Sequence, residues 1–428
     1  MKKFLPLFFL MLFILPITAI SQNVNGKNNS AVEVFYYSPS QPMSIQIIDF
    51  IRTVPEKHFL EPSAPRFLLM DSKHKFALGI GGTVRGTAGV DFVGIIPTST
   101  NDGFQTAFIP TSLGNHPRSQ ALMSAATSEF FIKMVGNTGK LGMFSVYLSM
   151  NFMGNNYTPQ LRNAYIDFLG FSIGQRWSTF TDLNAISPTI DYGGPISYAG
   201  YHLPQIRYTR MFAKQKFQFA VAAEFPTVNA TYNTTTISQP QGVPNIVGYL
   251  QANTPSGGHV RVSGLYRSMN YDDLRSMQTE RNNGWGVQLS GVTTISHAFK
   301  AYYQGIYGEG ISSYMNDLSN FAYDMVPNAA RRGDLQTLPM WGAYGGLQWN
   351  ITPEIFSSFT YSYSRIYSSN TYPMSGMYKY AQYYVANAFW NVTDAFQVGI
   401  EYIHGMRRDH SNGFGKANRM NLMVQYSF

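Results

Sequence analysis

Long stretches of this chain place an apolar residue at every second position. The last one alternates Leu422, Val424, Tyr426 and Phe428 with other residues, and similar stretches lie at 144–152 and 217–225. Because successive side chains of a strand point to opposite faces, each stretch predicts a strand with one apolar and one polar or small face. The stretches run for roughly 10 to 14 residues, whereas soluble strands average about 5–6 and tilted membrane strands need about 9–11. The length favours a transmembrane β-barrel over a soluble sandwich.

The first 21 residues indicate a signal peptide for export. Lys2 and Lys3 precede an apolar run, and Ala19-Ile20-Ser21 fits a cleavage pattern before Gln22. The alternative is a first transmembrane helix, but the run is at the short end of a spanning length. After it the chain has no run of about 18 apolar residues, which excludes a helical membrane protein.

The composition narrows the class further. Charged residues make up 13% of the chain, against about 25% in ordinary soluble domains. The 31 Phe and 29 Tyr provide ample apolar surface, so the chain is not disordered. The absence of Cys excludes disulfides, thiolate metal sites and a lipid-anchored Cys. The formal charge of +8 includes no basic run, so nucleic acid is not an expected partner.

Short and long connections alternate along the chain. Outer-membrane barrels have short periplasmic turns and long outer loops. The alternation predicts an all-β fold, a 16-stranded antiparallel transmembrane β-barrel over 75–428 with both ends on the periplasmic side. The first strand could be two, and the strand at 245–252 is the other weak one. The expected long loops are 94–120, 179–203, 226–244, 310–338 and 407–414. The expected strands are 75–93, 121–136, 141–153, 160–168, 171–178, 204–213, 215–225, 245–252, 257–268, 284–295, 298–309, 339–350, 353–366, 376–391, 394–406 and 415–428.

Residues 22–74 differ from the rest because Asn, Ser and Pro dominate them. Ile47, Ile48 and Ile51 lie at roughly helical spacing in a weakly amphipathic piece at 44–54. We expect an irregular periplasmic N-terminal extension here. A small plug or an assembly arm is the alternative.

Two segments carry a family resemblance. They are Leu161-Arg162-Asn163-Ala164-Tyr165-Ile166-Asp167 and Gly174-Gln175-Arg176-Trp177-Ser178-Thr179-Phe180-Thr181-Asp182. Both resemble motifs of the DcaP-like outer-membrane porin family, R-x-A-Y and G-Q-x-W-S-T-F-x-D. Further matches are 203–208, 284–286 and 307–311, so the resemblance spans about 66–428.

The chain departs from this family in two ways. Arg176 stands where the family often has Thr, and the long N-terminal coiled coil of some members is missing. The resemblance implies sixteen strands, a homotrimer in the bacterial cell outer membrane, and passage of small, often anionic solutes such as dicarboxylates. The expected function is therefore an outer-membrane porin for passive diffusion of small hydrophilic solutes, in contact with membrane lipids.

The loop at 179–203 is the candidate constriction. It contains Asp182 and Asp191, and a loop of this length is usually functional or disordered. We expect it to fold inward and narrow the pore. The alternative is an external loop that shields the rim or closes the trimer.

Four arginines are candidates for lining the pore and setting selectivity together with Asp182. Arg207 and Arg261 alternate with apolar residues, and Arg162 and Arg176 lie on one predicted hairpin. An Arg facing lipid at mid-depth costs roughly 2–4 kcal/mol, so each should face the lumen. Arg matches carboxylates bidentately, which suits an anion path. The alternative is a set of ordinary pairs with residues such as Asp167 or Glu224.

The chain end provides a candidate assembly signal. Tyr426 and Phe428 would share the outward face near the periplasmic aromatic girdle, and a terminal strand that ends in Phe resembles the recognition signal of outer-membrane barrels. A chance aromatic ending is the alternative.

Enzyme signatures are weak, and no cofactor or metal is expected. The 8 His show no metal-binding spacing, and Ser178 lacks a G-x-S-x-G context, so its expected role is packing or hydrogen bonding at a strand end. An outer-membrane barrel enzyme or adhesin remains the alternative function. An energy-coupled transporter would need a globular plug and about 22 strands, for which the chain has no room.

Overall fold

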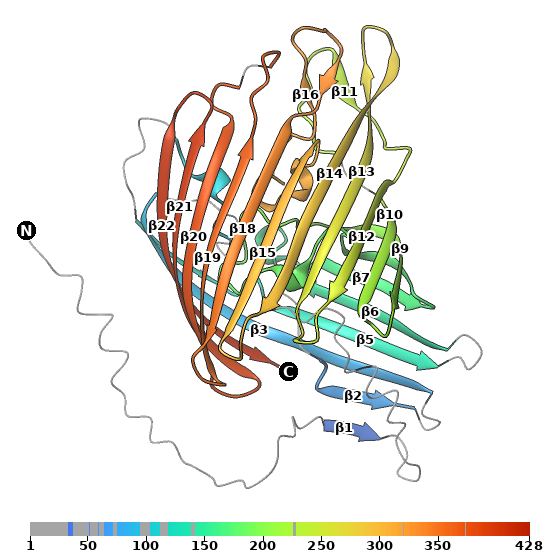
Figure 1. Cartoon of the computed structure of the whole chain (residues 1–428), viewed down its shortest axis with the longest axis vertical. Helices are drawn as coiled ribbons and strands as arrows, with labels where there is room; N and C mark the ends of the chain where they lie inside the picture. The colour runs from blue at the N-terminus through green and yellow to red at the C-terminus, as the bar shows by residue number, and fades with distance from the viewer. Residues whose placement is uncertain are drawn as a thin grey trace, which may run out of the picture. The chain divides into compact units, whose positions relative to one another are not determined.

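The described part of the chain folds around one closed antiparallel barrel (Figure 1). The structure, a computed structural model, describes residues 33–36, 51, 59, 64–71, 75–94, 103–111, 119–137, 142–225, 228–319, 321–372 and 374–428. Sixteen strands form the wall, as predicted. They are β3 (Phe76–Val93), β5 (Glu129–Asn137), β6 (Met143–Asn151), β7 (Gln160–Phe168), β8 (Phe171–Trp177), β9 (His202–Phe212), β10 (Phe217–Glu224), β12 (Asn245–Asn253), β13 (His259–Asp273), β14 (Gln278–Thr294), β15 (Phe299–Glu309), β18 (Pro339–Asn350), β19 (Ile355–Ile366), β20 (Tyr378–Asn391), β21 (Phe396–Asp409) and β22 (Phe414–Ser427).

The barrel closes because its last strand pairs with its first. β22 runs antiparallel to β3, with Ser427 opposite Thr83. The first strand is single, whereas the second predicted strand, 121–136, is interrupted. Its first part, β4 (Gln120–Ser124), pairs with residues 87–91 of β3, and β5 pairs with residues 76–83 of β3. The weakly predicted strand at 245–252 is confirmed as β12.

The alternation in the sequence separates lipid from interior. On β13, His259, Arg261 and Ser263 are buried, while Val260 and Val262 are 40% and 58% exposed. An apolar outward face is what a membrane-spanning barrel requires, because hydrocarbon cannot solvate polar side chains. Among the described residues, no helix is long and apolar enough to cross a membrane.

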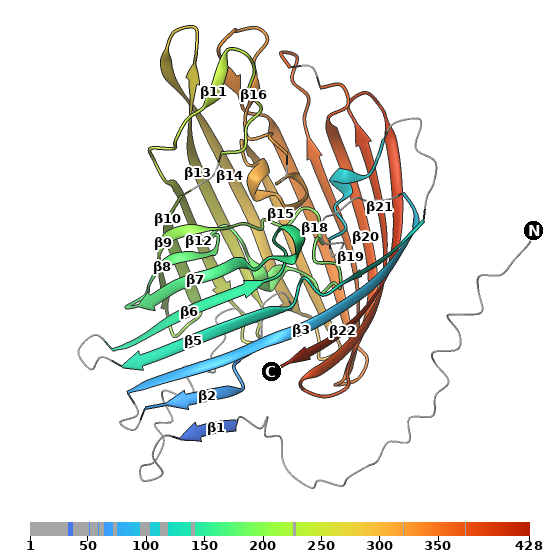
Figure 2. The same ribbon diagram turned by 180° about the vertical axis from the view of Figure 1, so that it is seen from behind.

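The wall is uneven in height (Figures 1 and 2). β13 and β14 have 15 and 17 residues, whereas β7 and β8 have 9 and 7.

The hairpin between β21 and β22 spans only 410–413, so the prediction of a long loop at 407–414 is wrong. Backbone pairing between Arg408 and Phe414 extends both strands through residues that look like a polar loop in sequence.

Two short strands lie in the segment predicted to be irregular. β1 (Glu33–Tyr36) pairs parallel to β2 (Phe67–Met70), which pairs antiparallel to β3. Leu68 and Met70 are buried together with Ile51, Ala77 and Val135, and this contact adds apolar burial to backbone pairing. Residues 1–21 and Ile47 and Ile48 lie outside the described residues.

Within the described residues, the connections on the side of the barrel opposite the short turns contain only short elements. The strands are β11 (Thr236–Ser238), β16 (Val326–Pro327) and β17 (Leu335–Gln336), and the 3-10 helices are η2 (Thr106–Phe108), η3 (Asn155–Tyr157), η4 (Leu183–Ala185), η5 (Ser312–Tyr314) and η6 (Asn316–Leu318).

Candidate functional site

Residues 178–201, which connect β8 to β9, lie inside the barrel and are called the inner loop here. Nearly all of them are buried. Inward side chains of the wall hydrogen-bond to the loop from many directions, and these side chains are Arg85, Glu224, His259, Arg261, Ser290, Gln304, Tyr344, Ser358, Thr360, Ser362, Tyr383, Asn387 and Glu401. The prediction that this loop folds inward is confirmed.

Glu224 of β10 holds the start of the inner loop. Its carboxylate accepts the Ser178 hydroxyl at 2.9 Å and the Thr179 backbone N–H at 2.6 Å. Glu224 is fully buried, so these donors replace the water that a carboxylate would otherwise bind. Ser178 therefore hydrogen-bonds at a strand end, as the sequence predicted.

Asp182 forms a second anchor against β13 and β14. Its carboxylate lies 2.8 Å from His259 Nε2, 2.6 Å from the Ser290 hydroxyl and 3.7 Å from Arg261. Burial favours the neutral acid, but Arg261, His259 and Ser290 outweigh it and lower the pKa of Asp182 to about 2. Asp182 receives both hydrogen bonds directly, so His259 does not stand between the carboxylate and Ser290 as a general base would.

A third anchor lies on the opposite wall, where Glu401 of β21 meets the far part of the loop. Glu401 accepts the backbone N–H groups of Ile190 at 2.6 Å and Asp191 at 2.7 Å. Asp191 in turn accepts the Phe104 backbone N–H and the Tyr383 hydroxyl at 2.7 and 2.8 Å. Burial is the main cause of the raised pKa of Asp191.

The candidate arginines Arg162, Arg176 and Arg261 pair with carboxylates inside the barrel. Arg162 lies 3.4 Å from Glu129, Arg176 lies 3.5 Å from Asp167, and Arg261 lies 3.7 Å from Asp182. Such ordinary Arg–carboxylate pairs are the alternative that the sequence analysis gave to pore-lining arginines. Asp182 anchors the inner loop and is only 1% exposed. A role of these residues in selectivity stays a prediction.

The arginines also meet at the base of the inner loop. The Arg162 guanidinium lies 5.2 Å from the Trp177 ring, and Arg207 donates to the Trp177 carbonyl at 2.5 Å. Arg261 donates to the Thr181 carbonyl at 3.0 Å. Arg176 lies over Tyr165 and donates to Ser172, toward the turn between β7 and β8. The structure therefore brings Arg162, Arg207 and Arg261 to the loop base and leaves Arg176 beside it.

Two further segments pack inside the barrel that the sequence assigned to outer loops. Asp317 of the 310–338 connection accepts the Thr106 hydroxyl at 2.6 Å and the Ala107 backbone N–H at 3.1 Å. Tyr314, Met315 and Leu318 are fully buried in the same apolar cluster as Phe104. These apolar residues within a polar stretch were the available signal, but period-two reasoning assigns no face to residues outside strands.

A cavity of about 590 Å³ lies between the inner loop and the turn side of the barrel. Asn184, Ile186 and Pro188 of the loop line it, and the wall contributes amides, a half-buried Lys300 and several aromatic rings. Its lining residues include no Asp or Glu. Such a chamber can hold a small polar solute next to a positive charge.

The chain end is held in the barrel wall. Phe428 and Gly82 exchange two backbone hydrogen bonds of 2.9 Å, and the Phe428 ring lies 6.5 Å from that of Phe67. Tyr426 is 48% exposed on the outward face. The role of both residues as an assembly signal stays a prediction. In the described ranges, no group of three or more His, Cys, Asp or Glu side chains could hold a metal ion.

Comparison with known proteins identifies one family and several solved structures with a similar fold. A family model described as DcaP outer membrane protein matches residues 71–428. No curated protein matches the sequence. The fold is similar to the outer membrane channel DcaP of Acinetobacter baumannii, with a TM-score of 0.70 and 21% identity over 83% of this chain and 99% of that one. It is also similar to an anion-selective porin from Comamonas acidovorans, with a TM-score of 0.54 and 9% identity over 83% of this chain and 100% of that one.

Proposed function

The chain belongs to the DcaP outer membrane protein family, and from this premise we propose that it is a porin of the bacterial outer membrane. It lets small hydrophilic solutes diffuse passively through its lumen and favours anions such as dicarboxylates. The matched channels of Acinetobacter and Comamonas support a channel of this kind. The protein carries out no covalent chemistry in this proposal, and an outer-membrane barrel enzyme or adhesin is the alternative.

The cavity below the inner loop is the observation that carries the anion preference. Its lining offers Lys300 and amide groups without a carboxylate, so it attracts negative charge and donates hydrogen bonds. Arg matches carboxylates bidentately, so Arg162, Arg207 and Arg261 at the loop base, and Arg176 beside it, would add to this preference.

The inner loop would act as the constriction. A sixteen-stranded wall encloses an aqueous lumen unless something fills it, and selectivity is set by the charges at the narrowest place. The carboxylates of Glu224, Asp182 and Glu401 are engaged in holding the loop. Their negative charge is therefore offset by bound donors, while Lys300 remains on the solute side.

We also propose that the protein is a homotrimer in contact with outer-membrane lipids. The strands β7 and β8 are among the shortest of the wall, and their outward residues Leu161, Ile166 and Ile173 are 46%, 46% and 42% exposed. Large apolar residues on a short wall suit burial against a second copy. Light scattering in detergent should give three chains per particle.

Residues 1–21 would direct export, and residues 22–74 would form a periplasmic extension beside the barrel. Mass spectrometry of the protein purified from outer membranes should show an N-terminus near Gln22. An intact N-terminus would contradict the signal-peptide assignment.

Planar bilayer recordings test the function. The purified protein should conduct ions, and its reversal potential in asymmetric salt should indicate anion preference. Added succinate should reduce the current of smaller anions by competing for the lumen. A protein that inserts without conductance would favour the enzyme or adhesin alternative, and cation preference would refute the anion proposal alone.

A further inference from the structure

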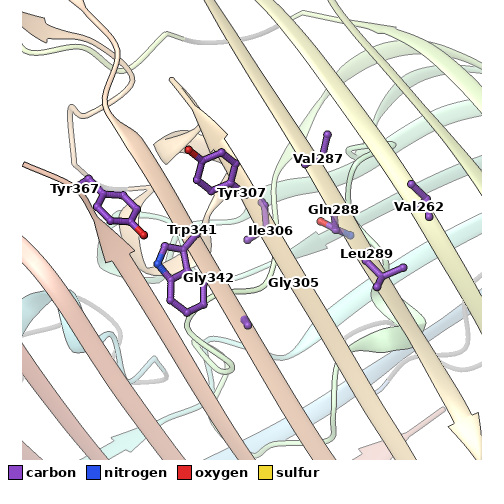
Figure 3. A pocket seen from close by; sticks show the side chains of 11 residues that line it. Val262, Val287, Gln288, Leu289, Gly305, Ile306, Tyr307, Trp341, Gly342 and Tyr367 are labelled. Atoms are coloured by element: carbon purple, nitrogen blue, oxygen red, sulfur yellow. The ribbon is translucent and has the colours of Figure 1, made fainter.

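An apolar groove runs along the outward wall across β13, β14, β15 and β18 (Figure 3). It has a volume of about 660 Å³. Figure 3 shows Tyr307, Trp341 and Tyr367 toward one end and Val262, Val287 and Leu289 toward the other. These side chains face away from the lumen, since their strand neighbours such as Gln288 are buried inside. We call this hollow the outer groove.

Two small residues create the outer groove. Gly305 of β15 lies directly opposite Ala343 of β18, and both line the hollow. A Cβ added to Gly305 would meet no atom within 4 Å, so the space above it is open. An open apolar groove on the membrane-facing wall fits an acyl chain, and the surrounding membrane supplies such chains.

A row of outward residues continues from the groove across the next strands. Trp341, Arg365, Tyr380, Arg408 and Phe414 occupy matching register positions on β18 to β22, and we call them the outward row. Trp341 also lines the outer groove. The row holds two positive charges and no carboxylate.

The two arginines of the row have unused binding capacity. The Arg365 guanidinium lies 4.8 Å from the Tyr367 ring, and that of Arg408 lies 5.6 Å from the Phe414 ring. In the part of the chain that the structure describes, neither forms an ion pair, and the buried Nε of each has no hydrogen-bond partner. Arg365 also donates a hydrogen bond to the Tyr363 side chain. Aromatic stacking orients both guanidinium groups, and each guanidinium has five N–H donors, so further donors are left for an anion.

Further positive charge gathers beside the row. The pKa of His410 is lowered, first by burial and also by the positive charges of Lys379 and Arg365, which outweigh a backbone hydrogen bond to Ile366 and the carboxylate of the neighbouring Asp409. Within the described ranges, the buried Nε2 of His410 has no hydrogen-bond partner. Lys416 is exposed on β22, two residues beyond Phe414. This concentration of cations at one edge of the wall is a match for phosphate.

We propose that the outer groove and the outward row form one binding site for a phosphate-bearing lipid of the outer leaflet, with an acyl chain in the groove and phosphate on Arg365 and Arg408. Neighbouring strands are about 4.8 Å apart, so the backbones of Arg365 on β19 and Arg408 on β21 lie roughly 10 Å apart, within reach of one phosphorylated sugar headgroup. Both lie near strand ends on the side of the barrel where most connections are long, and the long loops face outward in such barrels. The site holds whether or not the lumen conducts.

Lipid binding to the purified full-length protein tests the proposal. Native mass spectrometry would measure retention of bisphosphorylated lipid A and of dephosphorylated lipid A. The Arg365→Ala, Arg408→Ala double variant should bind bisphosphorylated lipid A roughly tenfold or more weakly, because each guanidinium supplies charge-assisted bonds. Gly305→Leu should fill the groove and weaken both lipids.

Matched variants keep the outcome specific. Arg210→Ala changes an outward arginine at the turn side, and Gly345→Leu adds a side chain at an outward glycine that also has open space but lies outside the groove. Both should bind as the unaltered protein does, and anomalous gel migration of unheated samples would show that every variant is folded. Equal binding by the double variant, equal loss in the controls, or full competition by inorganic phosphate would overturn the proposal.

Discussion

Removing the carboxylate of Glu401 should release the far part of the inner loop. This carboxylate accepts two backbone N–H groups, from Ile190 and Asp191, and in Glu401→Ala both donors would lose their partner inside the barrel. At about 1 kcal/mol for each hydrogen bond, the docked loop loses roughly 2 kcal/mol. That shift changes the ratio of docked to undocked loop roughly 30-fold, since 1.4 kcal/mol is a factor of about ten.

Single-channel recording and limited proteolysis would measure this release. The variant should show larger and noisier conductance than the unaltered protein, and faster cleavage within 188–193, while the Glu224 and Asp182 anchors keep the loop base in place. Glu401→Gln retains one acceptor oxygen and should have a smaller effect. Glu354→Gln, on an exposed turn, is the matched control. Identical noise and identical protection in Glu401→Ala would refute the idea that this carboxylate holds the loop.

Three other perturbations address the remaining interpretations. Arg176→Glu should shift the reversal potential toward cations more than Arg331→Glu in an exposed outer loop, and the difference should shrink at high salt because the Debye length is then only about 3 Å. Equal shifts would mean that Arg176 does not line the selective path. Deleting Phe428 removes its two hydrogen bonds to Gly82 and should lower the amount of barrel in the outer membrane; normal levels on an immunoblot would argue against the assembly role. Asp182→Asn should lower the thermal unfolding temperature in detergent, because Arg261 loses its nearby counter-charge while His259 and Ser290 keep a weaker acceptor; an unchanged temperature would show that the ion pair contributes no stability.

The barrel could be predicted because its signal is local. Side chains of a strand alternate with a period of two, so Val260 and Val262 against Arg261 already separate a lipid face from an inner face. Turn and loop lengths then fix the number and direction of strands without any knowledge of contacts. The same logic failed at 407–414, because backbone pairing of Arg408 with Phe414 depends on the neighbouring strand and not on local polarity.

The interior of the barrel was decided by contacts between residues far apart in the chain. Asp182 meets His259 and Ser290, and Glu401 meets Ile190, across separations that no spacing rule encodes. The sequence could show that the inner loop is long and that Arg261 points inward, since both follow from alternation. Only the tertiary structure paired that arginine with Asp182 and joined Arg365 to Arg408 along one row, because register between strands sets which side chains become neighbours.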